Sequence, residues 1–414
     1  MTFQIRPMIM AAAIAAAFAA PMAAHADNVK VAFIDPLSGP FAPVGQNILK
    51  SWQYVADMAN KEKWAGSHTL EVIGFDNKGS PQESLTVLKA AIDQGYRYII
   101  QGNGSGVALA LVDAVNKHNE RNPGKEVIYL NYAAVDPDLT NSKCSFWHFR
   151  LDANSDMKME AMTSLMEKEK DLKKVYIIGQ NYAFGHQVTK AAKDYLKRKR
   201  PDVQIVGDDL HPIGQVKDFS PYVAKIKASG ADTVITGNWG ADLALLIKAA
   251  KEAGLTANFY TYYAATTGVP TAMGASGEGR VKVITYWNPN GPSATGQNIV
   301  DGFKKKYNDD YTAMATYTGI SMLSKAFKDT NSVEPLKVAR AMEGMKITSL
   351  NGDVEMRKAD HQVQQPLYIA TWSKVNGKEV KYDQENTGYG WKTDRKIDTY
   401  VASQPSSCQM KRPD

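Results

Sequence analysis

The feature that most restricts the fold of this chain is a repeated alternation of apolar, strand-like runs with helix-like segments. Short turns separate them, and a capping box at Ser80–Glu83, with proline at the first helical position, marks one helix start. This alternation predicts a parallel sheet covered by helices on both faces. In the first part of the chain the strand patterns occupy residues 29–35, 69–76, 96–100 and 126–132.

The alternation then restarts, which predicts a second α/β lobe of similar size. No linker rich in Pro and Gly separates the two parts, so we expect the chain to cross between the lobes more than once. Facing lobes form a cleft at the carboxyl ends of their strands, where open α/β sheets bind ligands. The second set of strand patterns occupies residues 173–179, 203–209, 231–237, 258–263 and 280–287.

The later part of the chain is expected to be mainly helical and then extended. Val375–Lys378 is a hairpin turn signal between the runs LYIATWSK and KEVKY. From about residue 385 the sequence is polar and rich in Gly, Ser and Pro, which is typical of an extended tail. Helical patterns precede these features near residues 295–307, 313–328 and 334–345.

The first 26 residues have the pattern of a secretory signal peptide. Arg6 is the only charge before Asp27, residues 8–20 are apolar, and Ala24–Ala26 has the small-x-small pattern of a cleavage site. No cysteine lies near the cut, which argues against a lipid anchor. The sequence therefore predicts export to the periplasm and a mature chain that begins at Asp27.

Cys144 and Cys408 are the only cysteines, and in an oxidising compartment such a pair predicts one disulfide.

The formal net charge is +6, and the excess of basic residues is mild and dispersed. The densest basic run, residues 197–200, closes an expected helix, where cations suit the helix dipole. These features do not indicate a nucleic-acid partner.

The run QGNGSGVALALVDAV, residues 101–115, raises the main functional question. Gly102, Gly104 and Gly106 do not match the dinucleotide fingerprint G-x-G-x-x-G, and Asn103 stands where a nucleophile elbow needs glycine. No nucleophile–base pair or metal-ligand spacing is visible, so we expect no cofactor and no enzymatic activity. Ser105 is left with two interpretations, a plain helix N-cap or a carboxylate-binding helix N-terminus.

Several segments together resemble the leucine/isoleucine/valine-binding protein family, the type I periplasmic binding proteins of ABC importers. They are VAFIDPLSGPFAPVGQNI, FDNKGSPQESLTVLKAAIDQG, NYAAVDPDLT and KIKASGADTVITGNWGADLALLIKAAKEAGL. The resemblance implies two Rossmann-like lobes joined by three crossovers and a cleft that closes on a small molecule. It also implies a monomer that delivers its ligand to a permease and ATPase in the inner membrane.

The resemblance places the crossovers near residues 149–153, 277–281 and 349–355. The expected organisation is a signal peptide at 1–26, lobe 1 at 27–150 plus 280–352, lobe 2 at 151–279 plus 353–384, and a tail at 385–414.

The resemblance also implies a set of ligand-binding residues. Ser105, with Asn103 and Gly104 of the same turn, is expected to bind the carboxylate, and Ala133 and Ala134 match the backbone positions for an α-amino group. The aromatic walls of the pocket are expected to come from Phe41, Tyr182, Phe184, Trp239 and Tyr263.

Three positions depart from the family pattern. Val135 stands where threonine is expected, Tyr263 where an acid usually pairs with the ammonium, and Val44 where an aromatic is usual, with Phe41 nearby. An ammonium buried without a partner costs several kcal/mol. Asp136 could substitute, but it precedes Pro137 and is more easily explained as a turn residue.

The ligand therefore stays open at the level of sequence. A branched-chain amino acid is the family default, whereas the aromatic residues favour an aromatic carboxylate or a small amide. A sensory protein that presents its ligand to a membrane receptor would use the same fold. An exported enzyme is the third alternative, and it would need a catalytic pair that the sequence does not show.

Overall fold

The first lobe is built on a five-stranded sheet in the order β2-β1-β3-β4-β5, in which every neighbouring pair is parallel. The computed structural model describes residues 26–413. The expected signal peptide, apart from its last residue, lies outside them. The strands of this sheet are β1 (Asn28–Asp35), β2 (Thr69–Asp76), β3 (Tyr98–Gln101), β4 (Ile128–Asn131) and β5 (His148–Arg150).

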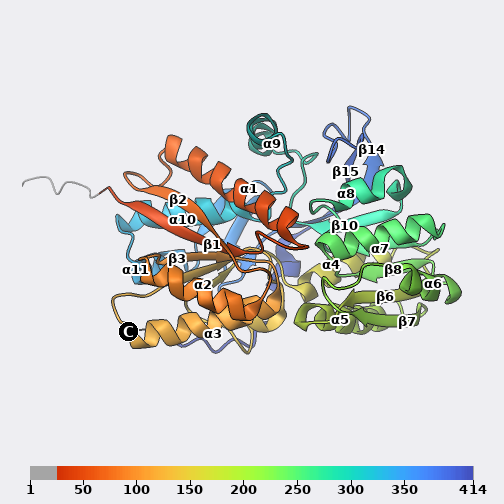
Figure 1. The fold of residues 1–414 in the computed structure, drawn as a ribbon, viewed down its shortest axis with the longest axis horizontal. Helices are drawn as coiled ribbons and strands as arrows, with labels where there is room; N and C mark the ends of the chain where they lie inside the picture. Colours follow the sequence, from red (N-terminus) through yellow and green to blue (C-terminus); the bar gives the residue numbers. More distant parts are fainter. Residues whose placement is uncertain (1–25, 414) are drawn as a thin grey trace, which may run out of the picture.

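Helices cover both faces of this sheet, as the alternation predicts (Figure 1). One face carries α1 (Ala42–Lys61), α10 (Thr316–Thr330) and α11 (Pro335–Met342), and the other carries α2 (Pro81–Asp93) and α3 (Ser105–Arg121). The capping box is present, because Ser80 Oγ accepts a hydrogen bond from the Glu83 amide at 3.3 Å. The helical face expected in α1 is buried at Val44, Ile48, Trp52, Val55 and Ala59.

The second lobe contains a seven-stranded sheet in the order β15-β14-β10-β9-β8-β6-β7. β14 and β15 are antiparallel to their neighbours, and the remaining pairs are parallel. The strands are β6 (Lys174–Gln180), β7 (Gln204–His211), β8 (Thr233–Thr236), β9 (Asn258–Thr261), β10 (Val281–Thr285), β14 (Leu367–Lys374) and β15 (Tyr389–Ile397).

Two groups of helices cover this second sheet (Figure 1). On one face α6, α7 and α8 pack together, and on the other α4 packs against α5. Residues of α6, α7 and α8 bury a core of the second lobe around Ile178, Val234 and Leu246. The buried residues of α4 and α5 belong to the cluster that continues into lobe 1. The bounds are α4 (Ser155–Met166), α5 (Ala183–Lys199), α6 (Ser220–Ala228), α7 (Gly240–Glu252) and α8 (Val269–Met273).

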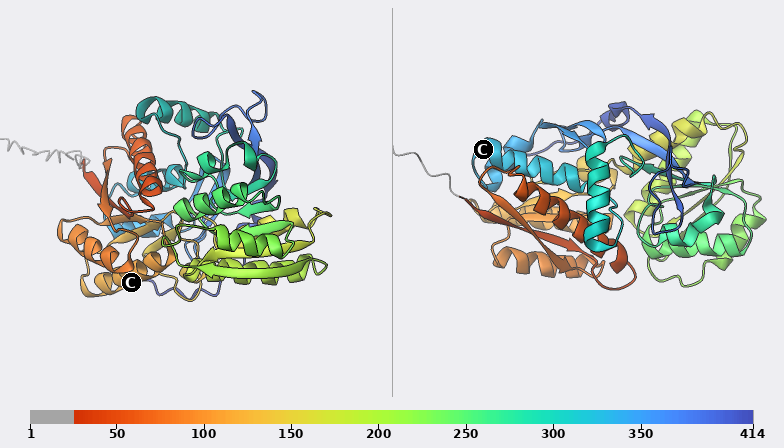
Figure 2. Two further views of the ribbon diagram at one scale, coloured as in Figure 1. Left: turned by 45° about the vertical axis from the view of Figure 1, so that its right-hand side comes forward. Right: turned by 90° about the horizontal axis from the view of Figure 1, so that it is seen from above.

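The chain crosses between the lobes four times. The first crossing lies between β5 and α4, the second between β10 and α9 (Ala294–Tyr307), and the third between β13 (Val363–Gln364) and β14. The fourth follows β15, because Cys408 near the C-terminus is bonded to Cys144 of lobe 1. α9 belongs to the first lobe, since Phe303 packs on Tyr54 of α1 with ring centroids 5.6 Å apart. Figure 2 shows α9 lying alongside α1.

Two expected lobe boundaries are therefore wrong. Residues 281–285 were expected in lobe 1, but they form β10, a central strand of the lobe 2 sheet. Residues 353–364 were expected in lobe 2, but Gln362 forms a parallel β-bridge with Arg150, the last residue of β5 in lobe 1. An apolar strand pattern predicts a strand but does not show which sheet that strand joins. The small sheet in this region consists of β11 (Lys346–Ser349), β12 (Gly352–Met356) and β13.

The C-terminal part also differs from expectation. β14 does not form a hairpin with residues 379–383, because it pairs along its whole length with β15, and the expected extended tail is a strand over Tyr389–Ile397. The Asn290 side chain instead accepts hydrogen bonds from the amides of Lys381 and Tyr382 at 2.7 and 2.8 Å. A side chain thus replaces the missing strand partner of this segment.

The predicted disulfide between Cys144 and Cys408 is confirmed, with the two Cα atoms 5.7 Å apart. The bond and neighbouring contacts hold the last residues against lobe 1, where Ser406 Oγ donates to the Thr140 carbonyl at 3.0 Å. Within residues 26–413, no helix combines the length and apolarity needed to cross a membrane.

Candidate functional site

A small pocket lies between the lobes where α3 begins, and it is called the α3 pocket below. It contains eight of the ten residues expected to bind ligand; the two outside its lining are Phe41 and Ala134. None of the described residues that line it carries a charged side chain. The lining consists of Val44, Gly102, Asn103, Gly104, Ser105, Ala133, Val135, Tyr182, Phe184, Trp239, Tyr263, Thr266 and Met314.

The first turn of α3 provides the polar end of this pocket. Gly104 is the N-cap residue, with φ 97°, and the first hydrogen bond of the helix runs from the Ala108 amide to the Gly104 carbonyl at 3.1 Å. The amides of Ser105, Gly106 and Val107 precede that bond and have no partner within the helix. α3 has no side-chain cap hydrogen bond, so Ser105 does not act as its N-cap. Free amides at a helix N-terminus favour an anion.

A buried network fixes the loop that leads into α3. The Asp35 carboxylate, at the end of β1, accepts hydrogen bonds from the Asn103 amide at 2.9 Å and the Gly102 amide at 3.2 Å. The Tyr132 hydroxyl donates to Asp35 at 2.6 Å and accepts from Asn103 Nδ2 at 3.0 Å. Complete burial raises the pKa of Asp35 to about 7, although these hydrogen bonds lower it.

Glycine is required at position 102 in this network. A Cβ atom there would lie 2.6 Å from the Tyr132 ring, so the ring can lie directly under the loop only because the side chain is missing. Hydrogen bonds to Asp35 and packing against the Tyr132 ring therefore fix the position of the loop.

Aromatic rings form the far wall of the pocket. Phe184 packs on Tyr263 with centroids 5.9 Å apart, and Trp239 Nε1 donates to the Tyr182 hydroxyl at 3.0 Å. Phe41 of lobe 1 packs on Trp239 of lobe 2 with centroids 4.1 Å apart, so it supports the wall from behind. The lobes thus touch across the cleft at this contact.

The backbone groups expected to receive an α-amino group already have partners. The Tyr263 hydroxyl donates to the Ala133 carbonyl at 3.2 Å. The Asn131 side chain bonds both the amide and the carbonyl of Ala134, each at 2.8 Å, which explains why Ala134 does not line the pocket. The Asp136 carboxylate accepts from the Asp138 amide at 3.0 Å, as expected of a turn residue.

Two lining residues, Thr266 and Met314, were not expected from the sequence. Thr266 lies in the segment after β9, and its hydroxyl donates to the Tyr263 carbonyl at 2.8 Å. Met314 precedes α10 in a stretch that the sequence predicts to be helical. No periodicity could reveal it, because its place depends on how the two lobes meet.

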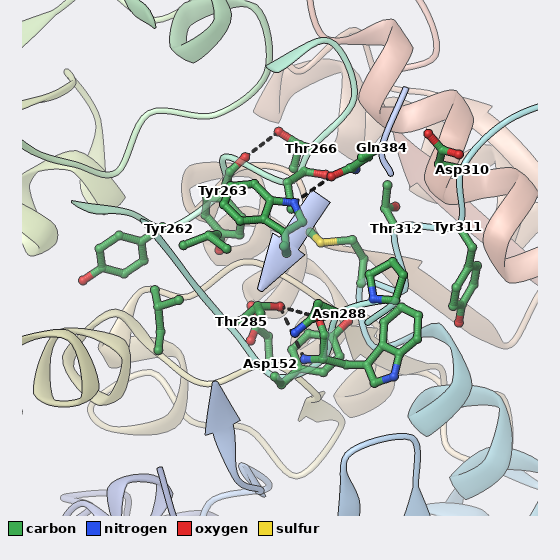
Figure 3. A pocket seen from close by; sticks show the side chains of 18 of the residues that line it. Asp152, Tyr262, Tyr263, Thr266, Thr285, Asn288, Asp310, Tyr311, Thr312 and Gln384 are labelled. Atoms are coloured by element: carbon green, nitrogen blue, oxygen red, sulfur yellow. Dashed lines mark hydrogen bonds between the residues drawn. The ribbon is translucent and has the colours of Figure 1, made fainter. Parts of the chain in front are cut away.

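A second and somewhat larger cavity lies beside the α3 pocket and is called the crossover cavity below. It shares Tyr263, Thr266 and Met314 with the α3 pocket. Figure 3 shows Tyr263 and Thr266 on one side of it and Asp152, with Thr285 and Asn288, on another. Because residues of the first two crossings line it, the cavity lies where the lobes are joined.

The arrangement can bind but shows no means of reacting. No group of three or more His, Cys, Asp or Glu side chains among residues 26–413 is placed to hold a metal ion. The α3 pocket contains one hydroxyl nucleophile beside free amides, Ser105, and no base lines it. Two α/β lobes joined by several crossings, with a pocket between them, define a protein of the ligand-capturing class.

The chain belongs to the periplasmic binding protein family, whose profile matches residues 28–386. It is of the leucine/isoleucine/valine-binding type, a non-enzymatic and periplasmic group of solute-binding proteins. The chain is 33% identical to Leu/Ile/Val-binding protein homolog 4 of Brucella abortus over 399 residues, which cover 94% of each chain.

Two solved structures show the same fold. The leucine-, isoleucine-, valine-, threonine- and alanine-binding protein of Brucella ovis, in its closed conformation, is 33% identical, with a TM-score of 0.82 over 93% of this chain and 100% of that one. A solute-binding protein of an ABC transporter from Rhodopseudomonas palustris, in complex with 3,4-dihydroxybenzoic acid, is 21% identical, with a TM-score of 0.76 over 90% and 98%.

Proposed function

We propose that this chain captures a small carboxylate in the α3 pocket and delivers it to a permease–ATPase complex in the inner membrane. In this proposal the chain is exported by its N-terminal signal peptide and acts as a monomer. The observation that carries it is the start of α3, where free amides and the Ser105 hydroxyl meet in a pocket with no charged lining side chain. A carboxylate bound there is stabilised by the partial positive charge of the helix end.

The kind of carboxylate is the finer part of the proposal. Branched-chain amino acids are supported by the names of the two Brucella relatives. A carboxylate without an ammonium is supported by the pocket itself, because the Ala133 carbonyl is bonded to Tyr263 and no acid lines the site. Buried ammonium groups need such partners. We favour the ammonium-free acid, and the aromatic wall suits a ring.

Two matched ligand pairs separate these candidates. Leucine differs from 4-methylpentanoate, and phenylalanine from 3-phenylpropionate, only in the α-ammonium. A ligand that binds only the folded state raises the melting temperature by mass action, so a thermal shift series ranks the four compounds. We expect the ammonium-free member of each pair to give the larger shift. Larger shifts for both amino acids would instead indicate that the chain binds amino acids.

Ser105→Ala tests the carboxylate site directly. Loss of a hydroxyl donor to a charged group should weaken binding of the preferred acid by about tenfold or more. The melting temperature of the free protein should barely change, since the Ser105 side chain makes no cap hydrogen bond. Isothermal titration calorimetry gives the affinity.

Ser324→Ala is the matched control, because Ser324 is as buried as Ser105 and its hydroxyl also has no protein partner. It lies in α10, outside the lining of both cavities. Equal losses of affinity in the two variants would reject the role of Ser105.

A further inference from the structure

The Asp35 carboxyl group is a buried acid without a cation beside it. It is 0% exposed, and none of the described Lys, Arg or His side chains forms an ion pair with it. Its partners are the amides of Gly102 and Asn103 and the hydroxyl of Tyr132. A buried carboxylate of this kind can escape the cost of desolvation by taking up a proton. Burial accordingly raises the pKa of Asp35 to about 7.

The charged groups on the neighbouring strands have other partners. Asp76 lies opposite Asp35 on β2, but its carboxylate accepts from the Leu37 amide at 2.9 Å. Arg150, at the end of β5, donates to Gln362 Oε1 at 2.6 Å. The charge of Asp35 is therefore balanced by hydrogen bonds alone.

The other titratable groups that face Asp35 are two tyrosines, and both keep their protons. Tyr129 is on β4 and Tyr132 follows that strand. Burial, followed by the nearby charge of Asp35, raises the pKa of each hydroxyl well above its ordinary value. Asp35 is therefore the member of this group that changes its protonation state near neutral pH.

A chain of hydrogen bonds links this acid to the wall of the α3 pocket. The Tyr132 hydroxyl donates to Asp35 at 2.6 Å and accepts from Asn103 Nδ2 at 3.0 Å. Asp35 and Tyr132 are 0% exposed, whereas Asn103 is 7% exposed and lines the pocket. The Oδ1 atom of Asn103 bonds to none of the described residues and is not fully buried. The free side of this carboxamide therefore faces the pocket.

Protonation of Asp35 reverses the direction of this chain. A protonated carboxyl group donates to the Tyr132 oxygen, so the hydrogen of Tyr132 needs another acceptor. A half-turn of the Asn103 carboxamide supplies it, because Oδ1 then accepts from Tyr132 and Nδ2 faces the pocket. The two ends of an amide have nearly the same shape, so the exchange needs no movement of the backbone. One proton on Asp35 thus replaces an acceptor in the pocket wall by a donor.

The two arrangements have opposite effects on a carboxylate bound at the start of α3. Asn103 lies two residues before Ser105, at most about 7.6 Å away along the chain. With Asp35 ionised, the pocket presents the Asn103 oxygen and a buried negative charge behind it, and both repel an anion. With Asp35 protonated, that charge is absent and Nδ2 adds a charge-assisted hydrogen bond to those of the free amides.

We infer that Asp35 controls the α3 pocket by its proton, so that the pocket binds a carboxylate tightly when Asp35 is protonated and weakly when it is ionised. Asp35 acts as a positioning residue, through Tyr132, on the carboxamide of Asn103. This inference deepens the proposed function and rests on it, because the acid must bind at Ser105. Binding takes up a proton near neutral pH, and the affinity falls as pH rises.

Calorimetry of the mature chain with 4-methylpentanoate and 3-phenylpropionate tests the inference. Both acids have ordinary carboxyl pKa values, so they are ionised from pH 6 upwards. A tenfold preference for the protonated pocket should make the dissociation constant about five- to tenfold larger at pH 8.5 than at pH 6. Titrations in two buffers of different ionisation enthalpy should show uptake of about half a proton per ligand at pH 7.5, and almost none at pH 6.

Two variants separate the proton from the group that responds to it. Asp35→Asn imitates the protonated acid, because its carboxamide can donate to Tyr132. It should bind both acids with the low-pH affinity at every pH and take up no proton. Asn103→Ala removes the donor that protonation turns to the pocket. It should weaken binding about fivefold at pH 6 and leave the affinity at pH 8.5 unchanged.

Asp136→Asn is the matched control. Asp136 is 2% exposed and burial also raises its pKa, but its carboxylate accepts from the Asp138 amide and does not line the α3 pocket. This variant should keep the pH dependence and the proton uptake of the wild type.

Three results would overturn the inference: no proton uptake by the wild type, a pH dependence that survives in Asp35→Asn, or equal losses at both pH values in Asn103→Ala. Binding that depends on Ser105 but not on pH would still leave the proposed function standing. If neither acid binds at any pH, the proposed function fails as well.

Discussion

The two compartments of the cleft, the α3 pocket and the crossover cavity, differ in what provides their polarity. In the α3 pocket it comes largely from backbone amides and one serine, inside a wall of aromatic and small side chains. In the crossover cavity it comes from side chains, including a buried ion pair and many hydroxyl groups. The first is suited to fix a negative charge, whereas the second is lined by charged side chains of both signs.

The two compartments also differ in the structural elements that hold their walls in place. The α3 pocket depends on the exact path of a loop held by Asp35 and Tyr132. The crossover cavity depends on the lobes meeting correctly, because each lobe contributes part of its wall. Substitutions in the two regions should therefore have different consequences, and three experiments test this.

The largest effect is expected at the ion pair of the crossover cavity. Lys158→Met leaves the Asp152 carboxylate buried without its counter-charge, which should cost about 3–5 kcal/mol of stability. Urea unfolding of the free protein measures it. Lys190→Met, which removes an exposed i,i+4 partner of Asp194, should cost less than about 0.5 kcal/mol. Similar losses in both variants would contradict the buried role of Lys158.

The next effect concerns pH and belongs to the α3 pocket. Burial raises the pKa of Asp35 from its ordinary value of 3.8 to about 7 in the folded protein. Between these two pH values the folded chain keeps a proton that the unfolded chain has lost. The stability contributed by this group is therefore complete below about pH 4 and is lost as pH rises through about 7. The change should amount to about 2–4 kcal/mol.

Asp35→Asn isolates this contribution. The buried His148, whose pKa burial lowers well below its ordinary value, titrates in both proteins and cancels in the difference. Measured by unfolding from pH 4 to pH 8, the stability of the wild type relative to the variant should fall as pH rises. A difference that is flat or grows with pH would show that Asp35 is ionised in the folded protein throughout this range.

The smallest effect is expected where the two compartments meet. Tyr263→Phe removes the hydrogen bond to the Ala133 carbonyl and should cost about 0.5–1.5 kcal/mol of stability. The freed carbonyl can then accept from an ammonium, so the affinity for leucine relative to 4-methylpentanoate should rise about threefold or more. Calorimetry on both ligands measures the ratio. An unchanged ratio would mean that Tyr263 does not exclude the ammonium.

Much of the α3 pocket could be predicted from local pattern and resemblance. The glycines before Ser105 marked a close backbone approach, and the segments around Ala133, Trp239 and Tyr263 matched the family in order. Phe41 and Ala134 do not line the α3 pocket, since sequence position does not show which side of the chain faces a cavity. Asp35 was missed, since an acid at a strand end has no signal until its partners from other strands are known.

The sequence by itself determined the alternation of strands and helices, the capping box, the disulfide and the helix start that can hold an anion. These follow from periodicity, turn chemistry and the fixed polarity of a helix, all of which act over a few residues. Only the tertiary structure decided that β10 and β15 join the second lobe, that Tyr263 takes the Ala133 carbonyl, and that a chain of hydrogen bonds links Asp35 to the α3 pocket. Those features depend on contacts between residues far apart in the chain, and such contacts form only when both lobes are packed and joined.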